Sequence, residues 1–390
     1  MREFEQSDML KRLPEQFFAK LSKKVQLLKE QGYDIINLGQ GNPDQPTPEH
    51  IVKELQIAAE DPKYHRYSPF EGFSIVKEAV AEFYKREYDV EIDPEEEVSM
   101  FFGAKQGLVD LAQGLLNPGD IALLPDPGYP DYLSGTAMAG AESVYMPLVK
   151  ENDFLPDYSE IPKDKLEKAR LMVLNYPNNP TAGTATKAFF DETVKLAKDH
   201  NFCVAHDFAY GSLGFDGQKP ISFLQSEGAK DIGVEIYTMS KTYNMAGWRI
   251  AFAVGNKSVI RSLNLIQDHI HVSLFGAIQQ AAAKALTGDQ TVVQELLEMY
   301  ERRRNTFVKA LHENGWKVDS PKGTFFSWLK VPDGYTSEGF TELLLKEAQV
   351  VVAPGNGFGT HGEGYVRAGI NASEEELEEA ARRIGKLELF

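Results

Sequence analysis

Between about residue 104 and residue 285, short apolar runs alternate with segments whose apolar positions recur at helical spacing. The apolar runs lie at residues 121–124, 171–174, 202–205, 235–239 and 250–254. Between two of them, Thr186 precedes Phe190, Val194 and Ala197, which are spaced as on one face of a capped helix. This order predicts an α/β architecture with a mostly parallel central sheet covered by helices.

The apolar pattern changes near Thr287. The following segment is apolar along one side as far as Gly315, which predicts a long helix with the arginine run 302–304 on a solvated face. Strand-like segments at 324–329 and 350–353 flank a helical one at 337–348, and the spacing of Ser373 and Glu376 predicts a capping box on a last helix. We expect a smaller α+β domain from residues 1–44 and 286–390, and a large domain at 45–285.

Composition is that of an ordinary globular protein, with 42% hydrophobic and 25% charged residues among 390. Lys and Arg number 41 against 58 Asp and Glu, and the resulting net charge of −17 argues against a nucleic-acid partner. No run of about 18 apolar residues predicts a membrane span, and the N-terminus lacks the apolar core of a secretory signal. Because Cys203 is the only cysteine, no intrachain disulfide is possible, and we expect a cytoplasmic protein.

The most informative segment places Lys241 just past a buried strand, with Gly247 in a turn and Arg249 eight residues further on. In an α/β sheet, ligands bind at the carboxyl ends of the strands. Burial beside cationic groups lowers the pKa of an amine, so such a lysine is able to form a Schiff base with an aldehyde.

Other strand ends also carry polar residues. Asp207 follows the run 202–205 by two residues. A carboxylate at the end of a buried strand needs a cationic partner, for which a protonated pyridine nitrogen is suitable. Asn179 lies in a loop rich in proline and amides after the run 171–174. Gly103 opens a helix-like segment whose first N–H groups are suited to a phosphate, and Tyr129 follows the run 121–124.

Together these segments resemble, over nearly the full length, the class I and II aminotransferases, fold type I enzymes that use pyridoxal 5'-phosphate. The resemblance implies that Lys241 is the Schiff-base lysine, that Asp207 keeps the pyridine nitrogen protonated, and that Tyr210 hydrogen-bonds the cofactor's ring oxygen. Asn179 is implied to bond the same oxygen and to border the substrate. The other cofactor-binding residues implied are Gly103, Ala104, Lys105, Tyr129, Thr238, Ser240 and Arg249. Tyr67 matches a tyrosine that reaches the phosphate of the neighbouring subunit, which implies a homodimer with shared active sites.

The substrate side of the site is implied by two further matches. Arg367 resembles the family's substrate-carboxylate arginine, whose planar fork binds a carboxylate through two hydrogen bonds, and Gly41 resembles the glycine that lies over the other face of that carboxylate. The chain departs from the family pattern at Ala182 and Ala251, where the family often has glycine.

The implied activity moves an α-amino group between an L-amino acid and a 2-oxo acid in a ping-pong mechanism, with the Lys241 amine moving the α-proton. The whole chain resembles the methionine-salvage members of the bacillus type, which implies amination of 4-methylthio-2-oxobutanoate to L-methionine. An aspartate or aromatic aminotransferase of broad specificity is the alternative. A dicarboxylate substrate needs a second cation; Lys105 is a candidate, but its place beside the phosphate loop gives it another role. Phe17 and Phe18 suit either a pocket for an apolar side chain or simple packing of the N-terminal arm.

Two other classes share this fold. A carbon–sulfur lyase uses the same lysine and aspartate but releases pyruvate and ammonia, and a transcription regulator needs an added DNA-binding module. The histidines His269 and His271 stand without a cysteine or acidic cluster, so we expect no metal site. His206 either tunes the charge of its neighbour Asp207 or is a packed core histidine.

Overall fold

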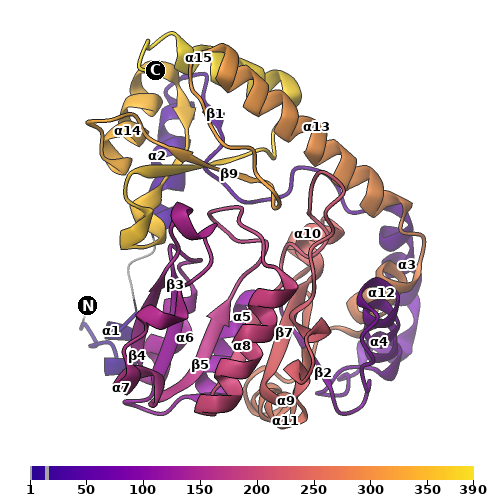
Figure 1. Ribbon diagram of the computed structural model, residues 1–390. Helices are drawn as coiled ribbons and strands as arrows, with labels where there is room; N and C mark the ends of the chain where they lie inside the picture. Colours follow the sequence, from indigo (N-terminus) through magenta and orange to yellow (C-terminus); the bar gives the residue numbers. More distant parts are fainter. Residues whose placement is uncertain (1, 14–16) are drawn as a thin grey trace.

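A seven-stranded sheet forms the centre of the larger part of the molecule, in the order β2-β8-β7-β6-β5-β3-β4 (Figure 1). The computed structural model describes the backbone of residues 2–13 and 17–390 and the side chains of residues 2–13 and 22–390. The strands are β2 (Val98–Phe101), β3 (Ile121–Asp126), β4 (Glu142–Pro147), β5 (Ala169–Leu174), β6 (Cys203–Asp207), β7 (Gly233–Thr238) and β8 (Ala251–Gly255). Strands β3 to β7 pair in parallel, and β8 is antiparallel to both of its neighbours. The predicted α/β fold with a mostly parallel sheet is confirmed.

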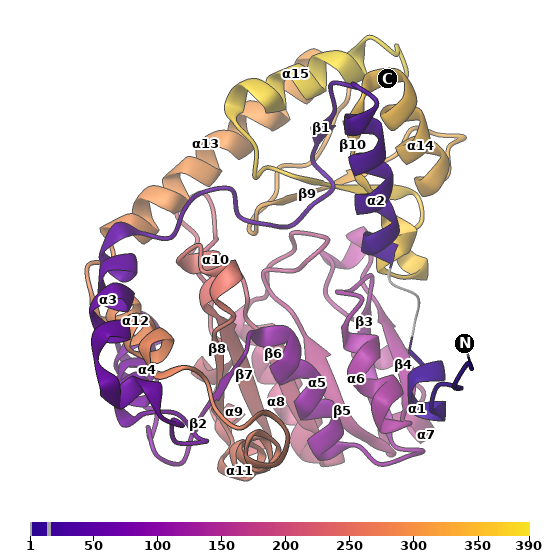
Figure 2. The same ribbon diagram turned by 180° about the vertical axis from the view of Figure 1, so that it is seen from behind.

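Helices cover both faces of this sheet, as the alternating pattern predicted. Figure 1 shows α8 in front of the strands, and the reverse view in Figure 2 shows α5 and α6 on the other side. On one face, apolar residues of the sheet pack against those of α5 (Ala104–Leu115), α6 (Tyr132–Ala139) and α11 (Lys257–Ile266). The opposite core lies beneath α4 (Ser74–Tyr88), α8 (Lys187–His200) and α12 (Gly276–Thr287). The Thr186 hydroxyl accepts from Phe189 N at 3.2 Å, so the predicted cap of α8 is confirmed.

The C-terminal third builds a second, smaller core above the carboxyl ends of the parallel strands (Figure 1). Its antiparallel sheet has the order β11-β12-β9, and β1 pairs in parallel with β10, which brings the N-terminal segment into this part. These strands are β1 (Ile36–Asn37), β9 (Phe326–Lys330), β10 (Val350–Val351), β11 (Ala353–Pro354) and β12 (Tyr365–Gly369). The helices around them are α2 (Phe17–Glu30), α13 (Thr291–Glu313), α14 (Ser337–Leu343) and α15 (Glu374–Gly385). Domain boundaries near residues 44 and 286 stay a prediction.

The prediction that the arginine run of α13 forms a solvated face is wrong for two of its three residues. Arg303 and Arg304 are buried, and each makes a bidentate ion pair, with Asp44 at 2.8 and 2.9 Å and with Asp216 at 2.7 Å. A planar guanidinium is tolerated in a core when its donors meet a carboxylate in this way. The two pairs join α13 to the N-terminal segment and to the chain that follows β6.

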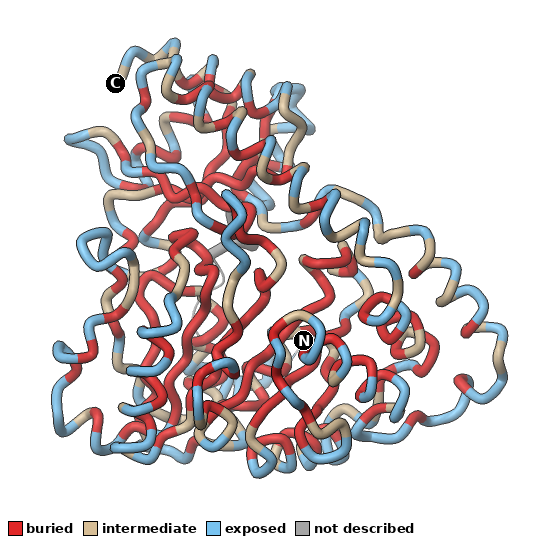
Figure 3. The backbone as a smooth tube through the Cα atoms, turned by 45° about the vertical axis from the view of Figure 1, so that its right-hand side comes forward, coloured by how far each residue is buried: buried red, intermediate tan, exposed pale blue. Residues whose placement is uncertain are grey.

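Buried residues concentrate in the interior of both parts of the molecule, as the red segments of Figure 3 show. The N-terminus lies beside the larger part, where Arg12 Nε donates to Ala137 O at 3.0 Å. No helix among the described residues is long and apolar enough to cross a membrane.

The capping box of α15 provides a test of local stability. Ser373 Oγ accepts from Glu376 N at 3.1 Å, and Ser373 N donates to Glu376 Oε2 at 3.0 Å. Ser373→Ala removes an acceptor for a free helix N–H, so we expect urea unfolding to show a loss of about 1 kcal/mol. Ser373→Asn, which keeps an acceptor, is the matched control and should lose much less. Equal losses in the two variants would contradict a capping role.

Candidate active site

A cavity of about 550 Å³ lies between the carboxyl ends of the parallel strands and the smaller part. Its wall comes from β6 and β7, the start of α5, the segment 37–42, and Arg367 on β12. Twelve of the residues singled out from the sequence line it: Gly41, Ala104, Lys105, Tyr129, Asn179, Asp207, Tyr210, Thr238, Ser240, Lys241, Arg249 and Arg367. Gly103 directly precedes this wall at Ala104. Tyr67 does not line the cavity and is 89% exposed.

Lys241 lies on the short helix α10 (Met239–Thr242), immediately after β7. Its Nζ donates to Gly41 O at 2.8 Å, across the boundary between the two parts of the molecule. Burial lowers the pKa of the Lys241 amine to about 8, and the positive charges of Arg367 and Arg249 act in the same direction. A usable fraction of the amine is therefore uncharged near neutral pH, as attack on an aldehyde requires.

Asp207 ends β6 at the floor of the cavity, and one of its oxygens is open to a ligand. Tyr132 donates to Oδ2 at 2.8 Å, whereas Oδ1 is buried with no hydrogen-bond partner among the described residues. Burial raises the pKa of Asp207, and the Tyr132 hydrogen bond opposes this. A buried carboxylate oxygen of this kind calls for a cationic donor. The protonated ring nitrogen of pyridoxal phosphate fits that requirement.

One end of the cavity is built for an anion. The N-terminus of α5 presents the backbone of Ala104 and Lys105, and Thr238 and Ser240 add hydroxyl groups. Gly103 has φ +94, and a Cβ there would collide with the guanidinium of Arg249. Helix N–H groups, hydroxyls and a guanidinium together are donors that bind phosphate. The phosphate of the cofactor therefore also finds suitable partners.

At the opposite end, Arg367 is buried on β12 with its guanidinium plane against two aromatic rings. Its Cζ lies 4.0 Å from the ring centre of Phe326 and 4.6 Å from that of Phe358. Nη1 donates to Asn179 Oδ1 at 2.8 Å and Nη2 to Gly39 O at 3.1 Å. The fork is thus held in one orientation, which a bidentate carboxylate ligand requires.

Two tyrosines from the sequence prediction complete the wall. Burial raises the pKa of both Tyr129 and Tyr210, so each phenol keeps its proton and remains a donor. The Tyr210 ring packs edge-on against Phe325 and Phe326, at centroid distances of 5.4 and 5.9 Å.

Sequence reasoning assigned no role to several residues that shape the site. Tyr132 holds Asp207, Asn175 Nδ2 donates to Asp207 O at 2.7 Å, and Phe326 packs on Arg367. Tyr132 lies three residues after Tyr129, in the same aromatic segment at the end of a predicted strand, and this proximity is the signal that the sequence offered. The described residues contain no group of three or more His, Cys, Asp or Glu side chains placed to hold a metal ion.

A lysine, an aspartate and a phosphate-type anion site at the carboxyl ends of a parallel sheet define an enzyme that uses pyridoxal 5'-phosphate. The chain belongs to the aminotransferases of class I and II, whose family model matches residues 33–384. The sequence-based prediction of this family, its fold and its cofactor is confirmed.

Several known proteins are similar to the chain over almost its full length. It is 62% identical to the L-glutamine--4-(methylsulfanyl)-2-oxobutanoate aminotransferase of Bacillus subtilis (strain 168), covering 99% of this chain and 97% of that one. Transaminase BacF of the same organism is 52% identical, with 98% and 96% covered. The solved structure of substrate-bound BacF has a TM-score of 0.95 at 51% identity, with 100% and 98% covered. The LL-diaminopimelate aminotransferase of Moorella thermoacetica is 44% identical, with 97% of each chain covered.

The pKa of Lys241 is testable through the assembly of the holoenzyme. We expect the rate at which cofactor-free enzyme forms its visible cofactor band to rise with pH and to level off above pH of about 8. Arg367→Met removes a neighbouring positive charge, so the midpoint should move upward. Arg302→Met, a change at an exposed arginine outside the cavity, is the control. A rate that keeps rising to the ordinary lysine pKa would contradict this assignment.

Proposed function

We propose that this aminotransferase converts 4-methylthio-2-oxobutanoate to L-methionine, with L-glutamine among its amino donors, as a step of methionine salvage. The observation that carries the proposal is the 62% identity, over 387 residues, to a relative whose name states this donor and acceptor. The composition of the cavity wall is consistent with such substrates.

The part of the cavity wall beside α2 and β1 is suited to an uncharged side chain. Val25 offers an apolar surface there, and Asn37 and Gln40 offer amides. Of the four described cationic side chains in the wall, Lys105 pairs with Asp131 at 2.9 Å, and the other three surround the cofactor and carboxylate positions. A second carboxylate therefore finds no free cation among the described lining residues, which disfavours aspartate as the preferred substrate. The side chains of Phe17 and Phe18 lie outside the described residues.

The cofactor contacts follow from the donor set. Lys241 would form the covalent link, Asp207 would hold the ring nitrogen, Tyr210 and Asn179 would donate to the ring oxygen, and Tyr129 would pack on the ring; all five line the cavity. Gly103, Ala104, Lys105, Thr238, Ser240 and Arg249 would hold the phosphate.

In the reaction, Arg367 and Asn179 fix the substrate carboxylate, while Gly41 leaves room above it. A Cβ on Gly41 would lie 3.0 Å from Phe326 Cζ and 3.9 Å from Arg367 Nη2. The bound cofactor acts as an electron sink that weakens the bonds at the substrate's α-carbon. The Lys241 amine, uncharged in part because of its lowered pKa, would take the α-proton from the substrate and deliver it to the exocyclic carbon of the bound cofactor. Holding the carboxylate orients the Cα–H bond toward this amine.

We also propose a cytoplasmic homodimer with shared sites. Tyr67 is exposed and lies outside the cavity of its own chain, and nearby Phe70 and Ile75 are 45% and 44% exposed. An exposed group of large apolar residues is typical of an interface. In a dimer, Tyr67 would reach the phosphate of the neighbouring subunit.

The substrate proposal is tested by single-turnover reactions. The holoenzyme is mixed separately with L-methionine, L-glutamine, L-glutamate, L-aspartate and L-phenylalanine, and loss of the visible band is recorded with identification of the oxo acid. We expect L-methionine and L-glutamine to react fastest, because their uncharged side chains need no second cation. Lys241→Ala should show no band loss through turnover.

The other outcomes distinguish the alternatives. Fastest reaction with L-aspartate or L-phenylalanine would assign a dicarboxylate or aromatic enzyme. Pyruvate and ammonia from a sulfur amino acid would indicate elimination.

A further inference from the structure

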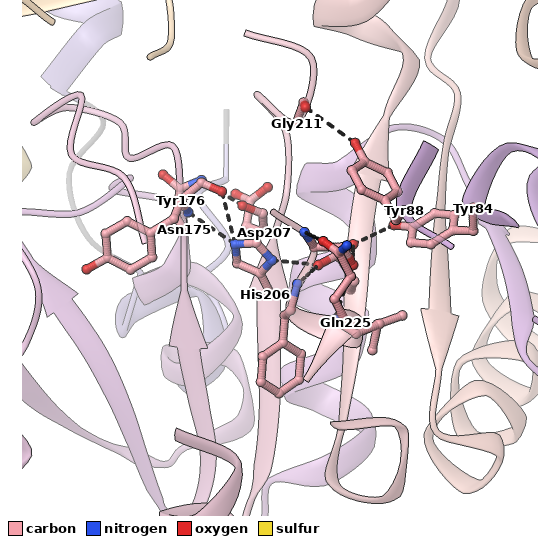
Figure 4. A network of polar contacts seen from close by, with 12 residues as sticks. Tyr84, Tyr88, Asn175, Tyr176, His206, Asp207, Gly211 and Gln225 are labelled. Atoms are coloured by element: carbon pink, nitrogen blue, oxygen red, sulfur yellow. Dashed lines mark hydrogen bonds and ion pairs between the residues drawn. The ribbon is translucent and has the colours of Figure 1, made fainter. Parts of the chain in front are cut away.

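Behind the active site, on the other face of the sheet, lies a buried polar network centred on His206 (Figure 4). His206 and Asp207 are consecutive in β6, so their side chains point to opposite faces. Asp207 faces the cavity, whereas the His206 ring lies in the core against Phe190 and Phe208, with centroid distances of 5.1 and 5.0 Å. The mechanism described above makes no use of His206.

On one side, the ring meets a carboxylate that is fully buried. Glu235 on β7 pairs with His206 in the register of the sheet and is 0% exposed. Its carboxylate lies within hydrogen-bond distance of His206 Nδ1, at 2.7 Å. Three further donors reach the same carboxylate: Tyr84 Oη at 2.8 Å, Ser222 Oγ at 2.7 Å and Phe223 N at 2.8 Å. Burial raises the pKa of Tyr84, so its phenol remains a donor. The two oxygens of a carboxylate accept all four of these bonds when Nδ1 is the ring nitrogen that carries the proton.

On the other side, the ring meets the main chain of Tyr176. Tyr176 N donates to His206 Nε2 at 3.2 Å, and Tyr176 O lies 3.1 Å from the same nitrogen. A buried backbone N–H needs an acceptor, and a neutral ring protonated on Nδ1 supplies one at Nε2. The titratable group that contacts the ring is thus Glu235 from β7, while Phe190 of α8 and Phe223 add only aromatic surface. Asp207 is adjacent in the same strand, but its side chain lies on the opposite face of the sheet.

Tyr176 begins the loop that reaches the substrate side of the cavity. The neighbouring Asn175 donates to Asp207 O at 2.7 Å and accepts from Asn179 N at 2.8 Å. Asn179 in turn accepts from Arg367 at 2.8 Å. A displacement of the Tyr176 main chain would therefore move Arg367 through the side chains of Asn175 and Asn179.

We propose that His206 is a positioning residue: oriented by the carboxylate of Glu235, it anchors the Tyr176 main chain and so places Asn179 against Arg367 for binding of the substrate carboxylate. The inference rests on the proposed role of Asn179 and Arg367. It gives the pair Glu235 and His206 a function in substrate affinity, in addition to filling the core.

The test compares two substitutions at His206 in the holoenzyme. Glutamine carries a donor group (NH2) and an acceptor group (C=O), so it is able to replace both hydrogen bonds of the neutral ring, whereas leucine carries neither. His206→Leu should raise the KM for the 2-oxo acid about tenfold with kcat within about threefold, since it removes hydrogen bonds that act on binding. His206→Gln should stay within about twofold of the wild-type KM because it keeps both bonds. Phe190→Leu, which alters the apolar packing against the His206 ring but removes none of its hydrogen bonds, is the control and should leave KM unchanged.

Other outcomes overturn the inference. If Phe190→Leu raises KM as much as His206→Leu, the effect is general loosening of the core. If His206→Gln raises KM like the leucine variant, the hydrogen bonds do not carry the role. Asn179→Ala tests the underlying function separately: an unchanged KM there would reject the proposed carboxylate site, whatever His206 does.

A second measurement needs no substitution that threatens folding. Nitrogen-15 spectra of the histidine-labelled wild-type enzyme, with and without cofactor, report the protonation of each ring nitrogen. The His206 signals are assigned by their absence from the spectrum of His206→Gln. We expect one protonated and one unprotonated nitrogen. A doubly protonated ring would overturn the inference, since Nε2 would then be unable to accept from Tyr176.

Discussion

The structure depends on the burial of one carboxylate, that of Asp207, at the end of β6. A charge withdrawn from water is costly unless donors and cations meet it. Here the surroundings are arranged to do so in part: Tyr132 of α6 donates to one oxygen, Asn175 fixes the main-chain carbonyl, and the other oxygen faces the cavity. The parallel sheet brings these groups together, because neighbouring strands end at the same edge. A cationic ring nitrogen at Asp207 Oδ1 would supply the partner that the described residues do not provide for this oxygen.

The charge of the cavity is opposite to that of the protein. The chain carries a net charge of −17, yet the described wall of the cavity holds Lys105, Lys241, Arg249 and Arg367 against the single acid Asp207. Such a local excess of positive charge favours the binding of anionic groups, here a phosphate and a carboxylate. Burial lowers the pKa of Lys241, and two of these cations, Arg367 and Arg249, lower it further, so the charges that suit the ligands also prepare the amine for its chemistry.

Sequence patterns predicted the elements and residues whose identity is set locally. The parallel strands β3, β5, β6 and β7 are apolar runs, and the helices α8 and α15 begin at capping residues. Asp207 is the last residue of β6, and Lys241 follows β7 by three residues. The edge strand β4 (Glu142–Pro147) is mostly polar or part-exposed and was not predicted. What escaped prediction depends on partners far away in the chain. Arg303 and Arg304 read as solvated because Asp44 and Asp216 lie more than eighty positions away in the sequence. The direction of β8, the hold of Tyr132 on Asp207 and the pairing of Glu235 with His206 have no local signature either.

The loop after β5 shows how hydrogen bonds hold a backbone conformation that the residue itself disfavours. Ala182 stands where the family often has glycine, and its backbone has φ +59, a region that costs an alanine about 1–2 kcal/mol. The loop keeps this shape because Asn178 determines it at several points. Asn178 Oδ1 accepts from Thr181 N at 3.0 Å and from Thr181 Oγ1 at 2.8 Å, while Asn178 O accepts from Ala182 N at 2.8 Å. The strain at Ala182 is thus carried by a network that also fixes the chain on both sides of Asn179, and the geometry at Arg367 does not need the glycine.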